Sequence, residues 1–260
     1  MKPLDLSNVR DYVNDNIVDF HKRRTKSLEE LDLGKLLKKN PYLFKAKNVV
    51  TAGELISSLL DAFLSSSEEK LFGDFLEDLA VFVAQKTCNG HKSAAPGVDL
   101  EFLNKGVHYV VSIKSGPNWG NSSQQNTLER DLKNAVVRVK QSRHGANVQP
   151  VLGICYGKTK TGYVRGYLKV VGQNFWYLIS ENKRLYTDII EPIGHRAKEH
   201  NDTFLQEKGK VVNRFTKAFI DEFCDHSGAI DWVSLVELNS GNFDLDKHLA
   251  VGSRVPKKSS

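Results

Sequence analysis

The chain has 260 residues, of which 40% are hydrophobic and 26% charged, and its formal net charge at pH 7 is +6. This composition is ordinary for a globular protein, and no apolar run is long enough to span a membrane, so we predict no membrane partner. The excess of positive charge favours a polyanionic partner such as DNA. The three cysteines are widely separated, which fits neither a disulfide framework nor a zinc site.

The first 64 residues are predicted to form an N-terminal helical region. They contain no apolar signal-peptide segment, which predicts a cytoplasmic protein. The stretch LDLSNVRDYVNDNIVDFHKRR repeats apolar residues close to the helical period. We expect a basic loop to follow, including HKRRTK, and then a helix that begins at Thr51 with Glu54 in the capping-box position.

Residues 65–190 are predicted to form the core domain, which opens with the stretch SSSEEKLFGDFLEDLAVFVAQKT. Its serines are followed three residues later by glutamates, the spacing of a capping box, so we expect a separate helix to begin here. Glu77 lies beside the apolar stripe of this helix. The residues alone favour a solvent-exposed carboxylate at this position.

Two neighbouring strands are predicted next, in PGVDLEF and YVVSIKSGPNWG, separated by the turn-like LNKG. This pairing places the carboxylate of Asp99 and the ammonium group of Lys114 together at one edge of a sheet. Side chains alternate along a strand, so Glu101 shares a face with Asp99, and Ser112 shares a face with Lys114. Asp99 and backbone oxygens suit a cation such as Mg²⁺, although a salt-bridged aspartate and an exposed lysine remain the plain alternatives.

A polar loop, GPNWGNSSQQ, leads into a predicted amphipathic helix, QQNTLERDLKNAVVRVKQSR. Asn and Gln side chains can bind base edges and lysines can bind phosphates, although a capped loop and solvated charges explain them equally well. The candidate DNA-contacting residues are Asn118, Trp119, Asn121, Ser122, Gln124, Gln125, Lys158 and Lys160.

The rest of the core is predicted to contain a buried strand in VQPVLGICYG and its hairpin partner in GYVRGYLKVV, joined by the basic turn KTKTG. NFWYLIS is compatible with a helix or a short strand. Residues 191–260 are predicted to form a C-terminal helical region.

The strand pair resembles the signature of the PD-(D/E)XK nucleases, in which an aspartate on one strand precedes an acidic-x-Lys tripeptide on the next. Here PGVD supplies the first part and SIK the second, with Ser112 in the usual acidic position. The succession of stretches from Glu69 to Ile179 is similar to type II restriction endonucleases that cut around a GG-N-CC core. This resemblance implies an α/β fold, with a restriction-endonuclease-like mixed central sheet flanked by helices and helical N- and C-terminal segments.

The resemblance also implies an activity, Mg²⁺-dependent, sequence-specific hydrolysis of double-stranded DNA that leaves 5′-phosphates. Asp99 and the carbonyl of Ile113 would serve as metal ligands, and Glu101, on the same strand face as Asp99, is a candidate second acid. Lys114 would position the attacking water. A palindromic target needs two sites related by a two-fold axis, so we expect a homodimer.

Ser112 carries no negative charge, so another acid must complete the site in this interpretation. The resemblance offers Glu77, as an auxiliary acid on the preceding helix, and Glu129, as a displaced acid on the following helix. For Glu129 the plain alternative is a carboxylate that stabilises the start of a helix.

Two other functions stay open: a structure-specific DNA repair nuclease of the same superfamily, and a non-catalytic DNA-binding or partner-binding protein on this fold. The sequence contains no HExxH, GxSxG, P-loop or GxGxxG motif in a suitable context. We therefore predict no nucleotide cofactor.

Overall fold

The computed structural model describes residues 1–251 and divides into two compact units. Unit 1 comprises Met1–Ser27 and Ser65–Leu205, and unit 2 comprises Leu28–Leu64 and the chain from Gln206 onward. The predicted border after residue 64 is also a border between the two units, whereas residues 1–27 belong to the unit that contains the sheet. The part of the predicted C-terminal region at 252–260 lies outside the described residues.

Unit 1 contains a six-stranded sheet with the strand order β1-β2-β3-β4-β6-β5. The strands are β1 His91–Lys92, β2 Leu100–Asn104, β3 Val107–Lys114, β4 Asn147–Ile154, β5 Gly162–Val164 and β6 Tyr167–Val171. β2 and β3 form the predicted antiparallel hairpin, and Lys105 and Gly106 at its tip have φ angles of 49° and 77°. Two successive positive φ angles are the mark of a type I′ turn, whose twist suits a tight hairpin.

The prediction that β4 and the GYVRGYLKVV segment form a hairpin is wrong. β6 is parallel to β4, and β5 folds back antiparallel on β6 at the edge of the sheet. The chain reverses at Arg165 and Gly166, with φ angles of 49° and 85°, and not at KTKTG, which belongs to the connection between β4 and β5. Because β3, β4 and β6 are parallel and the other pairings antiparallel, the sheet is mixed, which confirms the predicted fold class.

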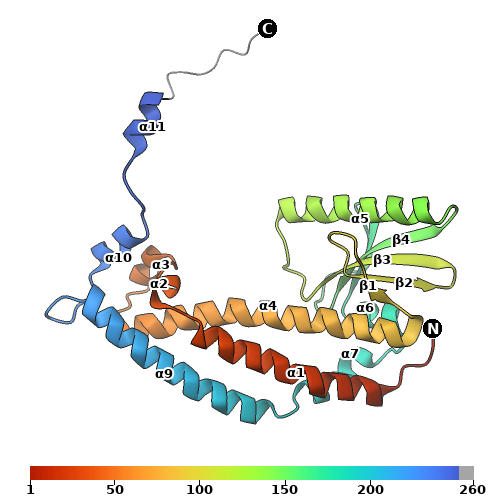
Figure 1. Cartoon of the computed structure of the whole chain (residues 1–260), viewed down its shortest axis with the longest axis horizontal. Coiled ribbons are helices and arrows are strands. Elements are labelled where there is room, and N and C mark those ends of the chain that lie inside the picture. The colour runs from red at the N-terminus through yellow and green to blue at the C-terminus, as the bar shows by residue number, and fades with distance from the viewer. Residues whose placement is uncertain (252–260) are drawn as a thin grey trace, which may run out of the picture. The chain divides into compact units, whose positions relative to one another are not determined.

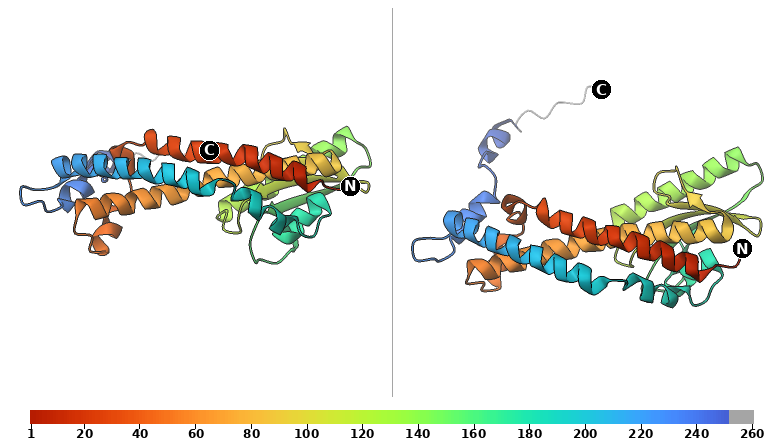
Figure 2. Two further views of the ribbon diagram at one scale, coloured as in Figure 1. Left: turned by 90° about the horizontal axis from the view of Figure 1, so that it is seen from below. Right: turned by 60° about the horizontal axis from the view of Figure 1, so that its bottom comes forward.

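Helices cover both faces of this sheet. α5 (Ser122–Ser142) packs on one face, where Leu128, Leu132 and Val139 join a buried cluster with side chains of β3 and β4 (Figure 1). The other face packs against α6 (Gln173–Ser180) and against the part of α4 (Ala52–Cys88) that follows Ser65. α1 (Leu6–Glu29) runs beside this part of α4 in both views of Figure 2, and the rings of Tyr12 and Phe82 stack with centroids 4.1 Å apart.

The predicted helix start near Ser65 is wrong, because α4 continues from Ala52 to Cys88 without a break. Leu60 and Leu64 are buried, so the apolar pattern of the helix runs up to these serines and their capping tendency does not end it. The predicted N-terminal cap is confirmed: Thr51 Oγ1 accepts a hydrogen bond from the N–H of Glu54 at 3.2 Å. The basic segment HKRRTK, predicted as a loop, lies within α1.

NFWYLIS is helical as part of α6. The remaining helices are α2 Leu33–Leu36, α3 Pro41–Ala46, α7 Leu185–Asp188, α8 Ile190–Ile193, α9 Ala197–Phe223, α10 Trp232–Leu238 and α11 Leu245–Val251. Of these, α9, α10 and α11 confirm the predicted helical C-terminal segment. Within unit 2, Asn239 Nδ2 at the end of α10 donates to the Leu37 carbonyl at 3.0 Å. None of the helices in residues 1–251 has the length and apolarity needed to cross a bilayer.

Candidate active site

The β2–β3 hairpin holds Asp99 at the end of the sheet. The register pairs Leu100 with Val111, so Asp99, directly before β2, lies opposite Ser112. The N–H of Asp99 donates to the Val111 carbonyl at 2.9 Å. Asp99 Oδ2 accepts hydrogen bonds from the N–H of Ile113 at 2.6 Å and from Ser112 Oγ at 3.4 Å. Backbone and side-chain bonds therefore fix this carboxylate against the carboxyl-terminal end of β3.

Lys114 is the half-buried last residue of β3, and it shares a face with Ser112 because strand side chains alternate. Its Nζ lies 6.0 Å from the ring centroid of Trp119, which packs against the cluster beneath α5. The Lys114 carbonyl accepts a hydrogen bond from the N–H of Cys155 at 2.9 Å, which extends the pairing of β3 with β4. Lys114 thus lies on the face and at the edge of the sheet where Asp99 is held.

Glu77 comes to this edge from α4. One turn earlier, a Cβ at Gly73 would lie 3.5 Å from Ser115 Oγ, so the helix passes close to the residue that follows Lys114. Burial raises the pKa of Glu77, and the negative charge of Asp99 raises it further, while Lys92 opposes the shift. The structure therefore brings Glu77 within electrostatic range of Asp99, although the two residues are distant in sequence.

Lys92 is a residue of this site that the sequence did not reveal. Its Nζ lies 3.4 Å from Glu77 Oε1 and 3.6 Å from Asp78 Oδ1, and the charge of Glu77 raises the pKa of the lysine. Only the pairing of the two-residue strand β1 with β2 brings it there. No sequence motif marks so short a strand.

Glu101 is engaged elsewhere. Its buried carboxylate accepts hydrogen bonds from Ser93 Oγ and from Arg138 of α5, and it contacts His108 Nε2 at 3.0 Å. Burial acts against ionisation, but these hydrogen bonds together hold the pKa of Glu101 below its usual range. Its carboxylate is thus occupied by protein donors, whereas no described residue donates a hydrogen bond to Oδ1 of Asp99.

On α5, Glu129 and Asp131 have different surroundings. Glu129 Oε1 lies 3.8 Å from Lys133 Nζ and borders a hollow with Arg165. Asp131 lies against the turn before Asp99, where a Cβ at Gly97 would come within 2.6 Å of Asp131 Oδ2. Gly97 has a φ of 70°, so glycine is needed there both for the backbone and for this contact. The sequence did not single out Asp131, and nothing in its spacing distinguishes it from Glu129.

The polar loop after Lys114 shapes the start of α5. Asn121 is the N-cap, and it forms a capping box with Gln124 through hydrogen bonds of 3.1 and 3.0 Å. Gln125 Nε2 donates to the Gly120 carbonyl at 3.4 Å. Asn118 and Ser122 are exposed, and the described residues provide no hydrogen-bond partner for either side chain. Their role in DNA contact stays a prediction, as does that of the capping residues.

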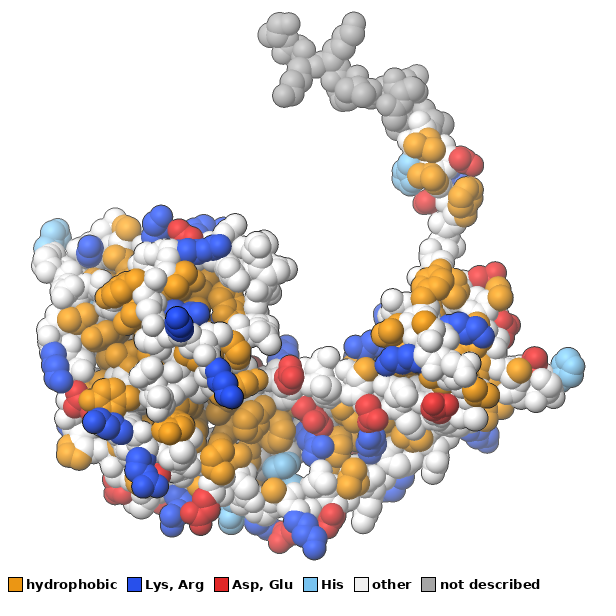
Figure 3. Space-filling model, turned by 180° about the vertical axis from the view of Figure 1, so that it is seen from behind, with side chains coloured by type: hydrophobic (Ala, Val, Ile, Leu, Met, Phe, Trp, Pro, Cys, Tyr) orange, Lys and Arg blue, Asp and Glu red, His pale blue; other side chains and the backbone are white. Residues whose placement is uncertain are grey.

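Lys158 and Lys160 lie in the exposed connection after β4. The register pairs Lys114 with Ile154, and the N–H of Tyr156 donates to the Ser115 carbonyl at 3.1 Å, so this connection leaves the same edge as the polar loop. Figure 3 shows Lys and Arg side chains spread over one face of unit 1 and not gathered in a single patch.

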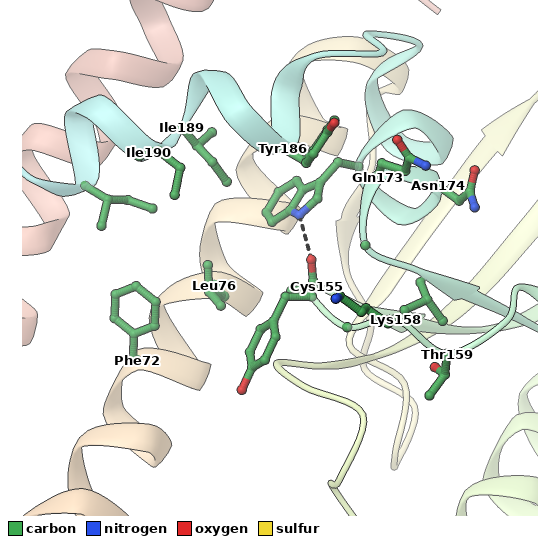
Figure 4. Close-up of a pocket in the computed structure, with 16 residues that line it drawn as sticks. Phe72, Leu76, Cys155, Lys158, Thr159, Gln173, Asn174, Tyr186, Ile189 and Ile190 are labelled. Carbon is green, nitrogen blue, oxygen red and sulfur yellow. Dashed lines mark hydrogen bonds between the residues drawn. The ribbon is translucent and has the colours of Figure 1, made fainter.

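An apolar hollow of about 760 Å³ lies at the carboxyl ends of β4 and β6. Figure 4 shows Phe72, Leu76 and Ile190 on one side of it and Lys158 on the other, with Trp176 Nε1 donating to the Cys155 carbonyl at 3.0 Å. Phe72 and Leu76 flank Gly73 on α4, so this hollow borders the edge that carries Glu77.

The side chains at this edge fit a magnesium ion better than a metal that needs a complete protein cage. Residues 1–251 contain no group of three His, Cys, Asp or Glu side chains placed to hold a metal ion. Asp99 and Glu77 supply two carboxylates, and the Ile113 carbonyl points to the same side of β3 as its N–H, toward Asp99. Mg²⁺ is commonly bound by one or two carboxylates and keeps several waters. A cation would also relieve the repulsion between Glu77 and Asp99.

Comparison with known families is consistent with this geometry. Residues 7–201 match the family model described as type II restriction endonuclease EcoO109I, and this range includes Glu77, Asp99 and Lys114. No curated protein matches the chain.

Proposed function

Because the chain belongs to the type II restriction endonuclease EcoO109I family, whose members are site-specific deoxyribonucleases and typically metal-dependent, we propose that it cleaves double-stranded DNA at a specific sequence with Mg²⁺. The cut leaves 5′-phosphate ends. The observation that carries this proposal is the 2.6 Å hydrogen bond that holds the Asp99 carboxylate at the end of β3, beside Lys114.

In this mechanism Asp99, Glu77 and the Ile113 carbonyl hold the metal ion. When bound, the ion stabilises negative charge on the phosphate and on the leaving 3′ oxygen. Lys114 orients the attacking water through its ammonium group. The hydroxyl of Ser112 fills the usual acidic position and supports Asp99 by a hydrogen bond, without adding charge. Glu101 is left out of the metal set because Arg138, His108 and Ser93 occupy its carboxylate.

DNA contacts are assigned to the two loops at the catalytic edge. Asn118 in the polar loop and Ser122 at the start of α5 are exposed and can reach base edges or phosphates, and Lys158 and Lys160 can neutralise phosphates. A homodimer would present two such edges to a palindromic site. A cytoplasmic location, where host DNA methylation would protect the cell's own sites, also stays a prediction.

A digest of unmethylated plasmid DNA tests the proposal. We expect a small set of discrete fragments with Mg²⁺ and intact plasmid with EDTA. Preferential cleavage of branched DNA would instead identify a structure-specific nuclease. DNA binding without cleavage under any divalent ion would identify a non-catalytic binder.

Glu77→Gln is expected to weaken Mg²⁺ binding by about tenfold or more, because it removes one of the two carboxylates. The pKa of Glu77 is raised in the folded state. In the metal-free protein, Glu77 therefore contributes most to the stability of the fold below the pKa of a glutamate in the unfolded chain. This contribution is lost as the pH rises through the folded-state pKa. Mg²⁺ binds the ionised form of Glu77, so the stabilisation of the protein by Mg²⁺ increases as the pH rises through the same range. The increase in melting temperature with Mg²⁺, measured against pH, reports both effects.

Asp78→Asn is the matched control, because Asp78 also pairs with Lys92 but is more exposed than Glu77. We expect this variant to respond to Mg²⁺ like the wild type. An unchanged Mg²⁺ response in Glu77→Gln would remove Glu77 from the metal site.

A further inference from the structure

A second hollow, of about 350 Å³, lies in unit 1 on the face of the sheet that α5 covers. It is bordered by β1, by β2 and β3 and by the carboxyl-terminal half of α5. The side chains that matter for its chemistry are His91, Glu101, His108, Arg138 and Arg143. Glu101 is two residues along β2 from Asp99, a distance of about 7 Å in a strand. Lys92, which pairs with Glu77, also borders the hollow, so the hollow adjoins the proposed metal site but is not lined by Asp99 or Glu77.

One buried group in this hollow lacks a hydrogen-bond partner. His108 is only 7% exposed, and its Nε2 contacts Glu101 Oε2 at 3.0 Å. Its Nδ1 is buried and has no partner among the described residues. Nearly all buried polar atoms in folded proteins are paired, so an unpaired ring nitrogen at the wall of a cavity points to a missing ligand.

The charges around the hollow favour an anion. Glu101 is the carboxylate that borders it, and that charge is matched by Arg138. Arg138 keeps 43% of its side chain exposed, so its guanidinium retains donors for a second acceptor. Arg143, the residue that follows the last residue of α5, forms no ion pair with any described residue. The positively charged side chains that border the hollow therefore outnumber its one carboxylate.

We propose that this hollow binds a phosphate group, held by the guanidinium groups of Arg138 and Arg143 and by the Nδ1–H of a doubly protonated His108, whose Nε2–H donates to Glu101. Guanidinium forks match the oxygens of phosphate in pairs, and donors that approach from a strand and from a helix suit a tetrahedral anion. The phosphate can come from DNA, as a phosphodiester beside the scissile one, or from free phosphate in solution. Only the DNA source rests on the proposed function.

The first test is titration of the metal-free full-length protein with inorganic phosphate, followed by calorimetry. We expect Arg143→Ala, which changes an exposed side chain, to weaken phosphate binding about tenfold or more. His108→Gln is expected to do the same, because glutamine can replace the Nε2 contact with Glu101 but offers no group at the Nδ1 position. Lys140→Ala is the matched control: it removes the same charge from an exposed position on α5 that does not border the hollow.

Two results would overturn the proposal: no phosphate binding by the wild type, or equal phosphate binding by Arg143→Ala and Lys140→Ala.

The second test separates the two sources by measuring DNA affinity against salt concentration in the presence of Ca²⁺. A DNA phosphate predicts that Arg143→Ala reduces the slope of log affinity against log salt by about one, and that Lys140→Ala leaves it unchanged. Weakened phosphate binding with an unchanged slope would assign the site to free phosphate. Failure of DNA cleavage would leave the calorimetric result intact.

Discussion

Asp99→Asn is expected to reduce DNA cleavage by about a thousandfold or more, equivalent to about 4 kcal/mol in the activation barrier. Asparagine keeps the size of the side chain, and its amide oxygen can still accept the hydrogen bond from the Ile113 N–H. The variant loses only the negative charge that we assign to the metal ion. Single-turnover cleavage of a plasmid containing one site, at saturating Mg²⁺, measures the effect.

DNA binding should survive this change, because Asp99 is assigned to no DNA contact. A mobility-shift titration and a thermal unfolding curve serve as controls for binding and for folding. Cleavage by Asp99→Asn within tenfold of the wild-type rate would exclude Asp99 as the central metal ligand.

Lys114→Met is expected to lower the single-turnover rate by about a hundredfold to ten thousandfold, the range typical of a positioned group that assists proton transfer. Methionine has a similar length and can keep the contact with the Trp119 ring, but it cannot orient a water molecule through a charged donor. The affinity for Mg²⁺ should be nearly unchanged. A loss that appears only in the chemical step would separate this role from metal binding.

Lys133→Met provides the matched comparison, because Lys133 is an exposed lysine on α5 whose one ion-pair partner within residues 1–251 is Glu129. We expect this variant to cleave at nearly the wild-type rate. If the two variants lost activity equally, the effect would reflect net charge, and the specific role of Lys114 would be rejected.

Several features of unit 1 were predictable because short segments encode them. The β2–β3 hairpin follows from two apolar runs around the turn at Lys105 and Gly106, and it places Asp99 opposite Ser112 without help from distant residues. The capping box that starts α5 is equally local, since Asn121 and Gln124 are three residues apart. The spacing of apolar residues, the capping residues and the turn residues act within a few positions of the chain, so they can be recognised in the sequence itself.

Other features depend on contacts between distant segments. β4 pairs in parallel with β6 and does not form the predicted hairpin. Buried leucines before the serines at 65–67 keep α4 continuous through these residues, although the serines match the pattern of a helix start. The surroundings of Glu77 and Lys92, and the position of Asp131 against Gly97, likewise arise from packing between separate elements. Such contacts are decided by which surfaces can be buried together, and no local spacing records that choice.

From its residues alone, this chain revealed an aspartate and a lysine at one edge of a sheet, because both lie on a single hairpin whose register a tight turn sets. The tertiary structure decided which residues surround the carboxylates. It places Glu77 near Asp99, and Arg138 and His108 against Glu101. The physical reason is that a carboxylate takes its role from the charges, donors and burial around it, and most of these neighbours come from other parts of the chain.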